Sequence, residues 1–351
     1  MNSGRPATNS EWFPTQTEKP TDCSPEIFSA GRTLRVGVLS NPLSRGNRKG
    51  LDEVRAFLAG QPQAIHREVQ TPADVASALV DFAHNSVDVV AVNGGDGTTQ
   101  AVLTALFHRR PFGKLPLLAI LRSGTDSSTA RDVGLKGSRK RALQKLFTWA
   151  HTRTGDAAIV ERPVLRVQGA VNQGPLYGMI FGAAGIYQGI RFTHSKVYTL
   201  GVYGSLAPGL TLARFLLALT RRKSDYVTPV PMTIALDRHP PVQVDCLLII
   251  VSTLERLVFG LRPFWGTEKA PLHYTAISAR PQYLFRALAS LLRGRKGRHG
   301  TTENGYFSHN VHEVRLTFDS GFTLDGELYT PDARLGPVVV RDGGQASFLR
   351  L

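Results

Sequence analysis

Apolar runs and polar turns alternate along the first half of the chain in the order expected of strand–helix repeats. Short apolar runs that predict strands occupy residues 34–39, 65–69, 87–92 and 115–121. Between them apolar residues recur at helical spacing, as in residues 51–58 and in the segment that holds Val75, Leu79 and Phe82. The run at 87–92 is almost wholly apolar, which is typical of a parallel strand covered on both faces. This rhythm predicts a parallel α/β domain.

The pattern changes after residue 155 to short segments of alternating polarity. These segments predict strands over residues 158–167, 176–183, 230–236, 243–252 and 314–318. We therefore expect the α/β fold class, with an N-terminal parallel α/β domain over residues 32–152 and a C-terminal β-rich sandwich domain over residues 153–351. Residues 1–31 lack apolar periodicity and predict a disordered leader. The last strand of the second domain either stays in that domain or returns to the first domain, and both arrangements stay open.

Composition narrows the classes of partner. The formal net charge of +15 favours anionic partners such as nucleotide phosphates, acidic phospholipid surfaces or nucleic acid. No paired Cys/His ligands or aromatic RNA-binding motif accompany the charge, so we expect no specific nucleic acid. The two cysteines, Cys23 and Cys246, are too few for a disulfide framework and are expected to be free thiols. Apolar runs are too short to span a bilayer and no secretory signal is visible, which predicts a soluble, cytoplasmic chain.

The most informative stretch follows the strand at 87–92 and reads Asn93-Gly94-Gly95-Asp96-Gly97-Thr98. Glycines between a strand and a helix bring bare backbone N–H groups towards a ligand at the positive end of that helix, and phosphate suits such a site. The alternative is a tight turn that uses glycine only for its backbone freedom. No Gly-Lys-Ser/Thr follows at P-loop spacing, and Gln100 stands where a dinucleotide fingerprint needs its third glycine.

Gly-Gly-Asp-Gly-Thr after an apolar strand resembles the nucleotide-binding signature of the diacylglycerol-kinase catalytic-domain family, which includes bacterial lipid kinases and sphingosine kinases. Residues 36–46 resemble the first strand and Asn-Pro loop of the family, with Asn41 facing ATP. Thr71 matches a family threonine near the nucleotide, although capping of the next helix explains it equally well. The resemblance implies a nucleotide-binding kinase domain of the NAD-kinase/diacylglycerol-kinase type, with contacts from Asn41, Thr71, Gly94, Gly95, Asp96, Gly97, Thr98, Gly124 and Thr125.

Two later segments extend the resemblance into the second domain. Residues 178–186 resemble the strand that opens the β-rich lipid-substrate domain of the family, and Asp325-Gly326-Glu327 resembles its catalytic segment. Two carboxylates around a glycine suit the orientation and deprotonation of a hydroxyl, whereas an exposed Asp-Gly hairpin is the alternative. The resemblance implies that Asp325 is the base for the lipid hydroxyl and that Glu327 supports it.

The sequence departs from the family pattern at two places. Ala101 stands where most members have a Glu, and the second polar loop reads Gly124-Thr125-Asp126-Ser127-Ser128 rather than Gly-Thr-Gly-Asn-Asp. These changes leave the metal ligands unassigned. The cofactors implied are ATP and Mg²⁺.

Three functions stay open at this stage. The first is a lipid kinase that transfers the γ-phosphate of ATP to diacylglycerol, a sphingoid base or a similar lipid. The second is an NAD-kinase-like kinase of a soluble substrate, and the third is a catalytically degenerate protein that binds nucleotide or lipid. Oligomeric state is not determined, and a homodimer stays open.

A membrane contact is expected near the end of the β-rich domain. Apolar residues at helical spacing precede a basic run over residues 293–299, and they are Tyr283, Leu284, Leu288, Leu291 and Leu292. An apolar stripe beside basic residues suits peripheral binding to the anionic inner face of a membrane. A core-packed helix followed by a solvated basic loop is the alternative.

Overall fold

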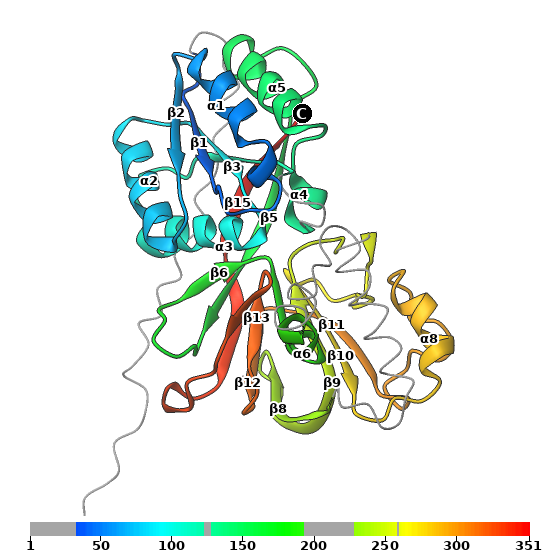
Figure 1. Ribbon diagram of the computed structural model, residues 1–351. Coiled ribbons are helices and arrows are strands. Elements are labelled where there is room, and N and C mark those ends of the chain that lie inside the picture. The colour runs from blue at the N-terminus through cyan, green and yellow to red at the C-terminus, as the bar shows by residue number, and fades with distance from the viewer. Residues whose placement is uncertain (1–32, 123–127, 193–227, 258–259) are drawn as a thin grey trace, which may run out of the picture.

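The computed structural model describes residues 33–122, 128–192, 228–257 and 260–351. Figure 1 shows an α/β region, coloured blue to green, above a β-rich region coloured green to red, and the C-terminus lies in the α/β region. The expected leader over residues 1–31 and the expected site residues Gly124 and Thr125 lie outside the described residues. The mixed fold class expected from the sequence is confirmed.

The α/β region is built from strands that all run in the same direction and pair in the order β4-β3-β1-β2. Its elements are β1 (Val36–Ser40), α1 (Leu51–Ala59), β2 (Ala64–Glu68), α2 (Pro72–His84), β3 (Val89–Asn93), α3 (Asp96–Thr104), β4 (Leu117–Ile120), α4 (Ser128–Val133) and α5 (Arg139–Thr152). Each strand and helix expected from the sequence is present here, with ends shifted by a few residues.

Helices cover both faces of the parallel sheet because successive strand residues point to opposite sides. Val90 of β3 packs in one cluster with Leu79 of α2, and Val89 packs in another with Leu143 of α5. These side chains are fully buried, and each contributes about 1.5–3 kcal/mol relative to an exposed position. The all-apolar run of β3 follows from this double coverage.

Helix α2 begins with a capping box. The Thr71 hydroxyl accepts a hydrogen bond from the Asp74 N–H at 3.2 Å, and the Asp74 carboxylate accepts one from the Thr71 N–H at 2.9 Å. Pro72 occupies the first helical position. The helix start expected from the sequence is thus confirmed, and it fixes Thr71 at the end of the turn that follows β2.

The β-rich region is mostly antiparallel. Its elements are β5 (Ala158–Gln168), β6 (Leu176–Gly178), β7 (Ile180–Ala184), α6 (Gly185–Phe192), β8 (Val230–Leu236), β9 (Val242–Ser252), β10 (Leu272–Ser278), α8 (Leu284–Leu291), β11 (Tyr306–Val311), β12 (Glu313–Thr317), β13 (Phe322–Leu324), β14 (Glu327–Tyr329) and β15 (Val338–Arg350). The first half of β9 pairs with β8, and its second half pairs with β7. This one long strand therefore links β8 to β7 within the sheet. Their apolar faces share one buried cluster.

The sequence predicted one continuous strand over residues 176–183, and this prediction is wrong. The segment forms two strands, β6 and β7, that are separated by Met179. Strand β6 pairs with β5, whereas β7 pairs with β9 and β13. The chain changes partners at Met179, whose N–H donates to Asp325 and whose carbonyl accepts from the Ser252 hydroxyl at 2.9 Å.

The last strand, β15, joins the two regions. It pairs along most of its length with β5, and Phe348 lies opposite Leu118 of β4 in the parallel sheet. Phe348 is fully buried in the same cluster as Val90. Strand pairing is therefore continuous from the parallel sheet into the β-rich region.

Helix α8 uses much of its apolar stripe inside the protein. Ala287 and Leu291 are buried against Tyr306, and Leu284 packs on the same cluster. The outward residues are Tyr283, which is 52% exposed, and Phe285, which is 67% exposed. The expected stripe is thus largely a core contact, and the side chain of Leu288 lies outside the described residues. Among the helices of the described ranges, none combines the length and apolarity needed to span a bilayer.

Candidate active site

The carboxyl ends of the parallel strands meet at one edge of the sheet, where ligands of open α/β folds bind. Gly94 and Gly95 connect β3 to α3 at this edge, and Gly95 precedes the first residue of α3. No side chain caps this end of α3, and the N–H groups at a helix N-terminus suit an anionic ligand. A methyl group built on Gly95 would meet no atom of the described residues within 4 Å, which indicates space for a ligand beside the helix terminus.

The first polar loop is tied to the glycine loop. The Asn41 side chain donates to the Thr98 hydroxyl at 3.0 Å, and the Asn41 N–H donates to the Asn93 carbonyl at 3.0 Å. Gly94 permits this arrangement, since any side chain there would collide with that of Thr98. The structure thus brings Asn41, Gly94 and Thr98 together at this edge of the sheet.

Two further asparagines stabilise the contact between the first polar loop and the glycine loop. Neither was among the expected site residues. Asn47 donates to the carbonyls of Asn41 and Asn93, each at 2.8 Å, and its own side-chain oxygen accepts from Arg139 at 3.1 Å. The Asn93 side chain is fully buried and donates to the Ser40 hydroxyl at 3.0 Å. An Asn that ends an apolar strand was the available sequence signal for Asn93, whereas Asn47 has no comparable signal.

A tight hairpin turn between β13 and β14 carries the acidic segment from the other region. Asp325 and Gly326 are its two turn residues, with φ angles of 50° and 89°, as a type I′ turn requires. Asp325 is not exposed as a simple hairpin turn would leave it. Its carboxylate accepts hydrogen bonds from the Met179 N–H at 3.0 and 3.1 Å and from the Ile180 N–H at 2.9 Å.

Burial raises the pKa of Asp325 well above its ordinary value, and the negative charge of Asp96 raises it further. The N–H groups of Met179 and Ile180 act in the opposite direction, and Glu327 adds a smaller upward shift of this pKa. The electrostatic coupling means that Asp96 of the glycine loop and Asp325 of the hairpin are neighbours. A raised pKa brings a carboxylate closer to the range in which it can exchange a proton near neutral pH.

Glu327 approaches the glycine loop directly. A side chain at Gly97 would collide with the Glu327 carboxylate, so these two residues are in contact across the regions. Glu327 is exposed, whereas Asp325 is only 8% exposed. The hairpin thus presents one buried and one open carboxylate to the start of α3.

A second contact fixes the hairpin against α3. Burial raises the pKa of the Tyr329 hydroxyl to about 12, and the neighbouring Gln100 side chain acts in the opposite direction. Thr104, one turn further along α3, accepts from the Tyr177 N–H at 2.9 Å. Helix α3 is thereby held by β6 on one side and β14 on the other, and neither Gln100 nor Tyr329 was expected from the sequence.

The remaining expected site residues make other contacts. Thr71 is exposed and its hydroxyl serves the capping box. The Asp96 carboxylate accepts from the Ser128 N–H at 3.1 Å, which ties the glycine loop to the start of α4. Gly124 and Thr125 precede this contact but lie outside the described residues.

The residues present fit a nucleotide with a divalent cation. Open space at Gly95 and the uncapped start of α3 suit phosphate oxygens. Asp96 and Glu327 supply carboxylate oxygens, the ligands that Mg²⁺ takes together with phosphate. Within the described ranges, no group of three or more His, Cys, Asp or Glu side chains could hold a metal ion alone. A cation here would therefore depend on the phosphates for part of its coordination.

Comparison with known proteins agrees with this geometry. Residues 35–159 match the family model described as "Diacylglycerol kinase catalytic domain". A curated protein of Stenotrophomonas maltophilia (strain K279a), named "Probable lipid kinase YegS-like", is 30% identical over 112 residues. That match covers 32% of this chain and 36% of the relative, so the chain matches about a third of the relative's length.

Solved structures show the same fold over nearly the whole chain. A putative diacylglycerol kinase from Bacillus anthracis str. Sterne superposes with a TM-score of 0.60 at 18% identity, covering 90% of this chain and 96% of that one. Another structure, titled as a diacylglycerol kinase of the same organism, gives a TM-score of 0.55 at 18% identity with the same coverage.

Proposed function

We propose that this chain, whose residues 35–159 match the diacylglycerol kinase catalytic domain, is an ATP-dependent lipid kinase. The observation that carries the proposal is the meeting of Asp325 and Glu327 with the glycine loop. These carboxylates are more than two hundred residues away from Asp96 in sequence, yet Asp96 shifts the pKa of Asp325 and Gly97 contacts Glu327. A phosphate-binding loop and a proton acceptor thus border one site.

ATP and Mg²⁺ would supply the phosphoryl group and the positive charge that offsets the triphosphate. The N–H groups at the start of α3 bind phosphate oxygens, and the Asn41–Thr98 hydrogen bond holds the loop that faces them. Asp325, with its raised pKa, accepts the proton of the attacking lipid hydroxyl. Its hydrogen bonds to Met179 and Ile180 fix the carboxylate, and a carboxylate has lone pairs left after three such bonds.

The test is transfer of radiolabel from ATP to a panel of lipid extracts by the wild-type chain and two matched variants. Asp325→Asn is expected to lower turnover by about 10²–10⁴-fold, the range for loss of a general base. Glu327→Gln is expected to have a smaller effect. A larger loss in Glu327→Gln than in Asp325→Asn would reverse the two roles, and near-normal turnover in both would refute the assignment. Thermal unfolding checks that both variants fold.

The partition of label separates the other functions. Product in the organic phase supports the lipid kinase, and mass analysis of that product identifies the acceptor. Label in a water-soluble product would support an NAD-kinase-like kinase of a soluble substrate. Nucleotide binding without transfer would support a catalytically degenerate protein, for which Ala101 is the motivating departure from the family pattern.

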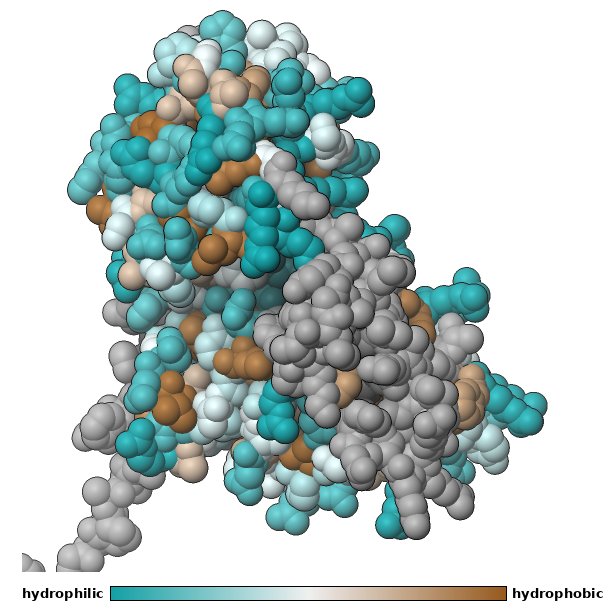
Figure 2. Space-filling view, in the orientation of Figure 1, coloured by the Kyte–Doolittle hydropathy of each residue, from teal (hydrophilic) through white to brown (hydrophobic). Residues whose placement is uncertain are grey.

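The proposal includes contact with an anionic membrane surface through α8 and the loop after it. The outward side chains of Tyr283 and Phe285 lie next to exposed basic residues, namely Arg286, Arg293, Arg295, Lys296 and Arg298. Figure 2 shows hydrophobic and hydrophilic residues side by side at the right edge of the molecule, where Figure 1 places α8. Aromatic residues beside basic ones suit the interface between lipid head groups and acyl chains.

A further inference from the structure

Arg162 of β5 joins the two regions through two ion pairs. Its Nε atom lies 3.0 Å from the Asp132 carboxylate of α4, and one of its Nη atoms lies 3.4 Å from the Glu255 carboxylate in the loop after β9. The side chains of Arg162 and Asp132 are 18% and 6% exposed, whereas that of Glu255 is 60% exposed. The attraction between Arg162 and Asp132 is therefore the stronger of the two, because solvent screens it less.

Arg162 lies where the two strands β5 and β15 pass together from one region to the other. Two residues before it, Val160 lies opposite Phe348, which also pairs with β4 of the parallel sheet. Just beyond it, the register of the two strands shifts at a bulge between Asp342 and Gln345. A bulge interrupts the ladder of backbone hydrogen bonds and bends the strand. Side-chain contacts beside the bulge therefore help to fix how the two regions meet.

Helix α4 connects this ion pair to the glycine loop. Asp132 comes four residues after Ser128, the first residue of α4, and residues four apart lie on the same face of a helix. The Ser128 N–H donates to the Asp96 carboxylate at 3.1 Å. Because α4 has only 6 residues, it has few internal hydrogen bonds, and its direction depends on contacts with its neighbours. A single helical turn thus separates the contact with Arg162 from the contact with Asp96.

Apolar packing places the same elements together. Ala130 and Val133 of α4 belong to the buried cluster that also contains Val164 of β5 and Leu254, the residue before Glu255. Apolar contact is non-directional and leaves the orientation of a short helix weakly determined. The planar guanidinium of Arg162 supplies a directional contact, since its N–H groups point in fixed directions.

We propose that Arg162 is a positioning residue, which orients α4 through Asp132 and so holds the Asp96 carboxylate beside the acidic hairpin. The contact with Glu255 ties this arrangement to the β-rich region. The kinetic consequence rests on the proposed kinase function, whereas the orientation of α4 does not, because the exchange of its amide hydrogens is measured without turnover.

The test compares Arg162→Met, Asp132→Leu and the double variant. Each single change leaves one charge without this partner and is expected to lower the melting temperature, whereas the double variant is expected to recover most of that loss. By contrast, kcat/KM for ATP is expected to stay about ten- to 100-fold low in all three, since a displacement of about 1 Å in a catalytic group can cost 100-fold. The KM for the lipid is expected to stay unchanged. Arg162→Lys, which keeps the charge, is expected to restore part of kcat/KM.

Hydrogen exchange detected by mass spectrometry measures α4 in the absence of ATP and lipid. Peptides that cover residues 128–133 are expected to exchange about tenfold faster in Arg162→Met and in the double variant than in wild type, while peptides that cover β3 stay unchanged. This result would support the positioning of α4 even if wild type phosphorylated no lipid. Absence of lipid phosphorylation by wild type would refute the proposed function alone.

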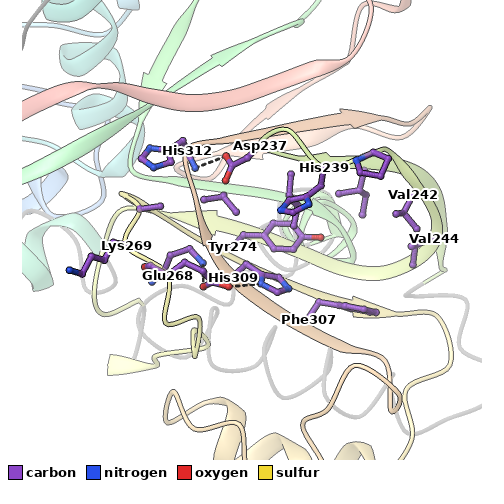
Figure 3. A pocket seen from close by; sticks show the side chains of 16 residues that line it. Asp237, His239, Val242, Val244, Glu268, Lys269, Tyr274, Phe307, His309 and His312 are labelled. Atoms are coloured by element: carbon purple, nitrogen blue, oxygen red, sulfur yellow. Dashed lines mark hydrogen bonds and ion pairs between the residues drawn. The ribbon is translucent and has the colours of Figure 1, made fainter.

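Two control variants remove ion pairs that lie within one region. Arg55→Gln, in the α/β region, loses contacts with Asp52 at 2.8 Å and with Glu68 at 2.6 Å. Glu268→Gln, in the β-rich region, loses the contact at 2.7 Å with His309, which Figure 3 shows at the edge of a cavity. Both variants are expected to keep the kcat/KM of wild type and its exchange rate in α4.

Three outcomes would overturn the inference. The first is exchange of residues 128–133 at the wild-type rate in Arg162→Met. The second is a kcat/KM that recovers together with the melting temperature in the double variant, which would show that the ion pair serves stability alone. The third is an equal loss of kcat/KM in the two control variants, which would show that removal of any ion pair has the same effect.

Discussion

The carboxylate of Glu327 fills the space that a side chain at Gly97 would need. Gly97 lies in the first turn of α3, and Glu327 begins β14 in the other region. The glycine therefore permits a contact between two segments that are distant in the sequence. This contact can be tested separately from the fold.

Gly97→Ala is expected to displace Glu327 and lower kcat/KM for lipid phosphorylation by about 100-fold, since a shift of about 1 Å in a catalytic group can cost that much. Steady-state kinetics with Gly97→Ala, Glu327→Ala and the double variant measure the coupling. Because one displaced carboxylate causes both losses, the double variant is expected to be no worse than Glu327→Ala alone. Losses that simply multiply would show that the two residues act independently.

Gly95→Ala distinguishes a ligand-binding space from a structural one. The added methyl would meet no atom in the part of the chain that the structure describes, and the φ of −87° suits alanine, so the melting temperature is expected to stay within about 1 °C. If phosphate occupies that space, the KM for ATP is expected to rise about tenfold or more. A normal KM for ATP in a normally folded Gly95→Ala protein would place the phosphates elsewhere.

Asp325 is expected to make stability depend on pH. Its pKa in the folded state lies above the ordinary value of 3.8, so the folded protein keeps a proton that the unfolded chain has already lost. Stability from this group therefore falls as pH rises from about 3.8 through the raised value, by at most about 1.4 kcal/mol per pH unit. Urea unfolding of wild type and Asp325→Asn between pH 4 and 8 isolates the effect. The difference, wild type minus variant, is expected to decrease with pH, and a constant difference would contradict the raised pKa.

Thr71→Ala separates capping from nucleotide contact. Loss of the hydroxyl that accepts from Asp74 is expected to cost about 0.5–2 kcal/mol of stability, measured by chemical denaturation. The KM for ATP is expected to stay unchanged if Thr71 only caps α2. Thr71→Ser, which keeps the hydroxyl, is the control for stability, and a raised KM for ATP in Thr71→Ala alone would add the nucleotide contact.

Neutralising Arg293, Arg295, Lys296 and Arg298 to Gln is expected to release the protein from anionic vesicles. Each basic residue near such a surface contributes about 1 kcal/mol, so the loss of affinity is expected to reach about 10²–10³-fold at low salt. Vesicle sedimentation measures it. The control neutralises the same charge in the α/β region, at the exposed residues Lys136, Lys140, Arg141 and Lys145. Equal losses in both proteins would indicate attraction by net charge rather than a surface at α8.

Local patterns predicted the parallel region well because strand, turn and helix signals agree there. The capping box at Thr71 and the apolar run of β3 are examples in which neighbouring residues determine the structure. The β-rich region was harder. Strands β10 and β11 were not expected, since their long-range partners rather than a local pattern favour them.

The site was predicted from motifs for Gly94, Gly95, Asp96, Gly97 and Thr98, which the structure places at the edge of the parallel sheet. Asp325 was expected as a catalytic residue. No local pattern showed that it would be buried and would accept hydrogen bonds from the N–H groups of Met179 and Ile180. The Gln100–Tyr329 contact likewise joins segments more than two hundred residues apart. Such contacts depend on the topology of the whole chain.

The return of β15 to the parallel sheet has a consequence for biosynthesis. Phe348 completes the edge of β4, and Arg350 still pairs with Ala158 of β5. During translation, β4 has an unpaired edge and an incomplete core until β15 has been synthesised. A nascent chain of this protein therefore exposes that edge to aggregation or to chaperones while the more than two hundred residues between β4 and the end of β15 are made.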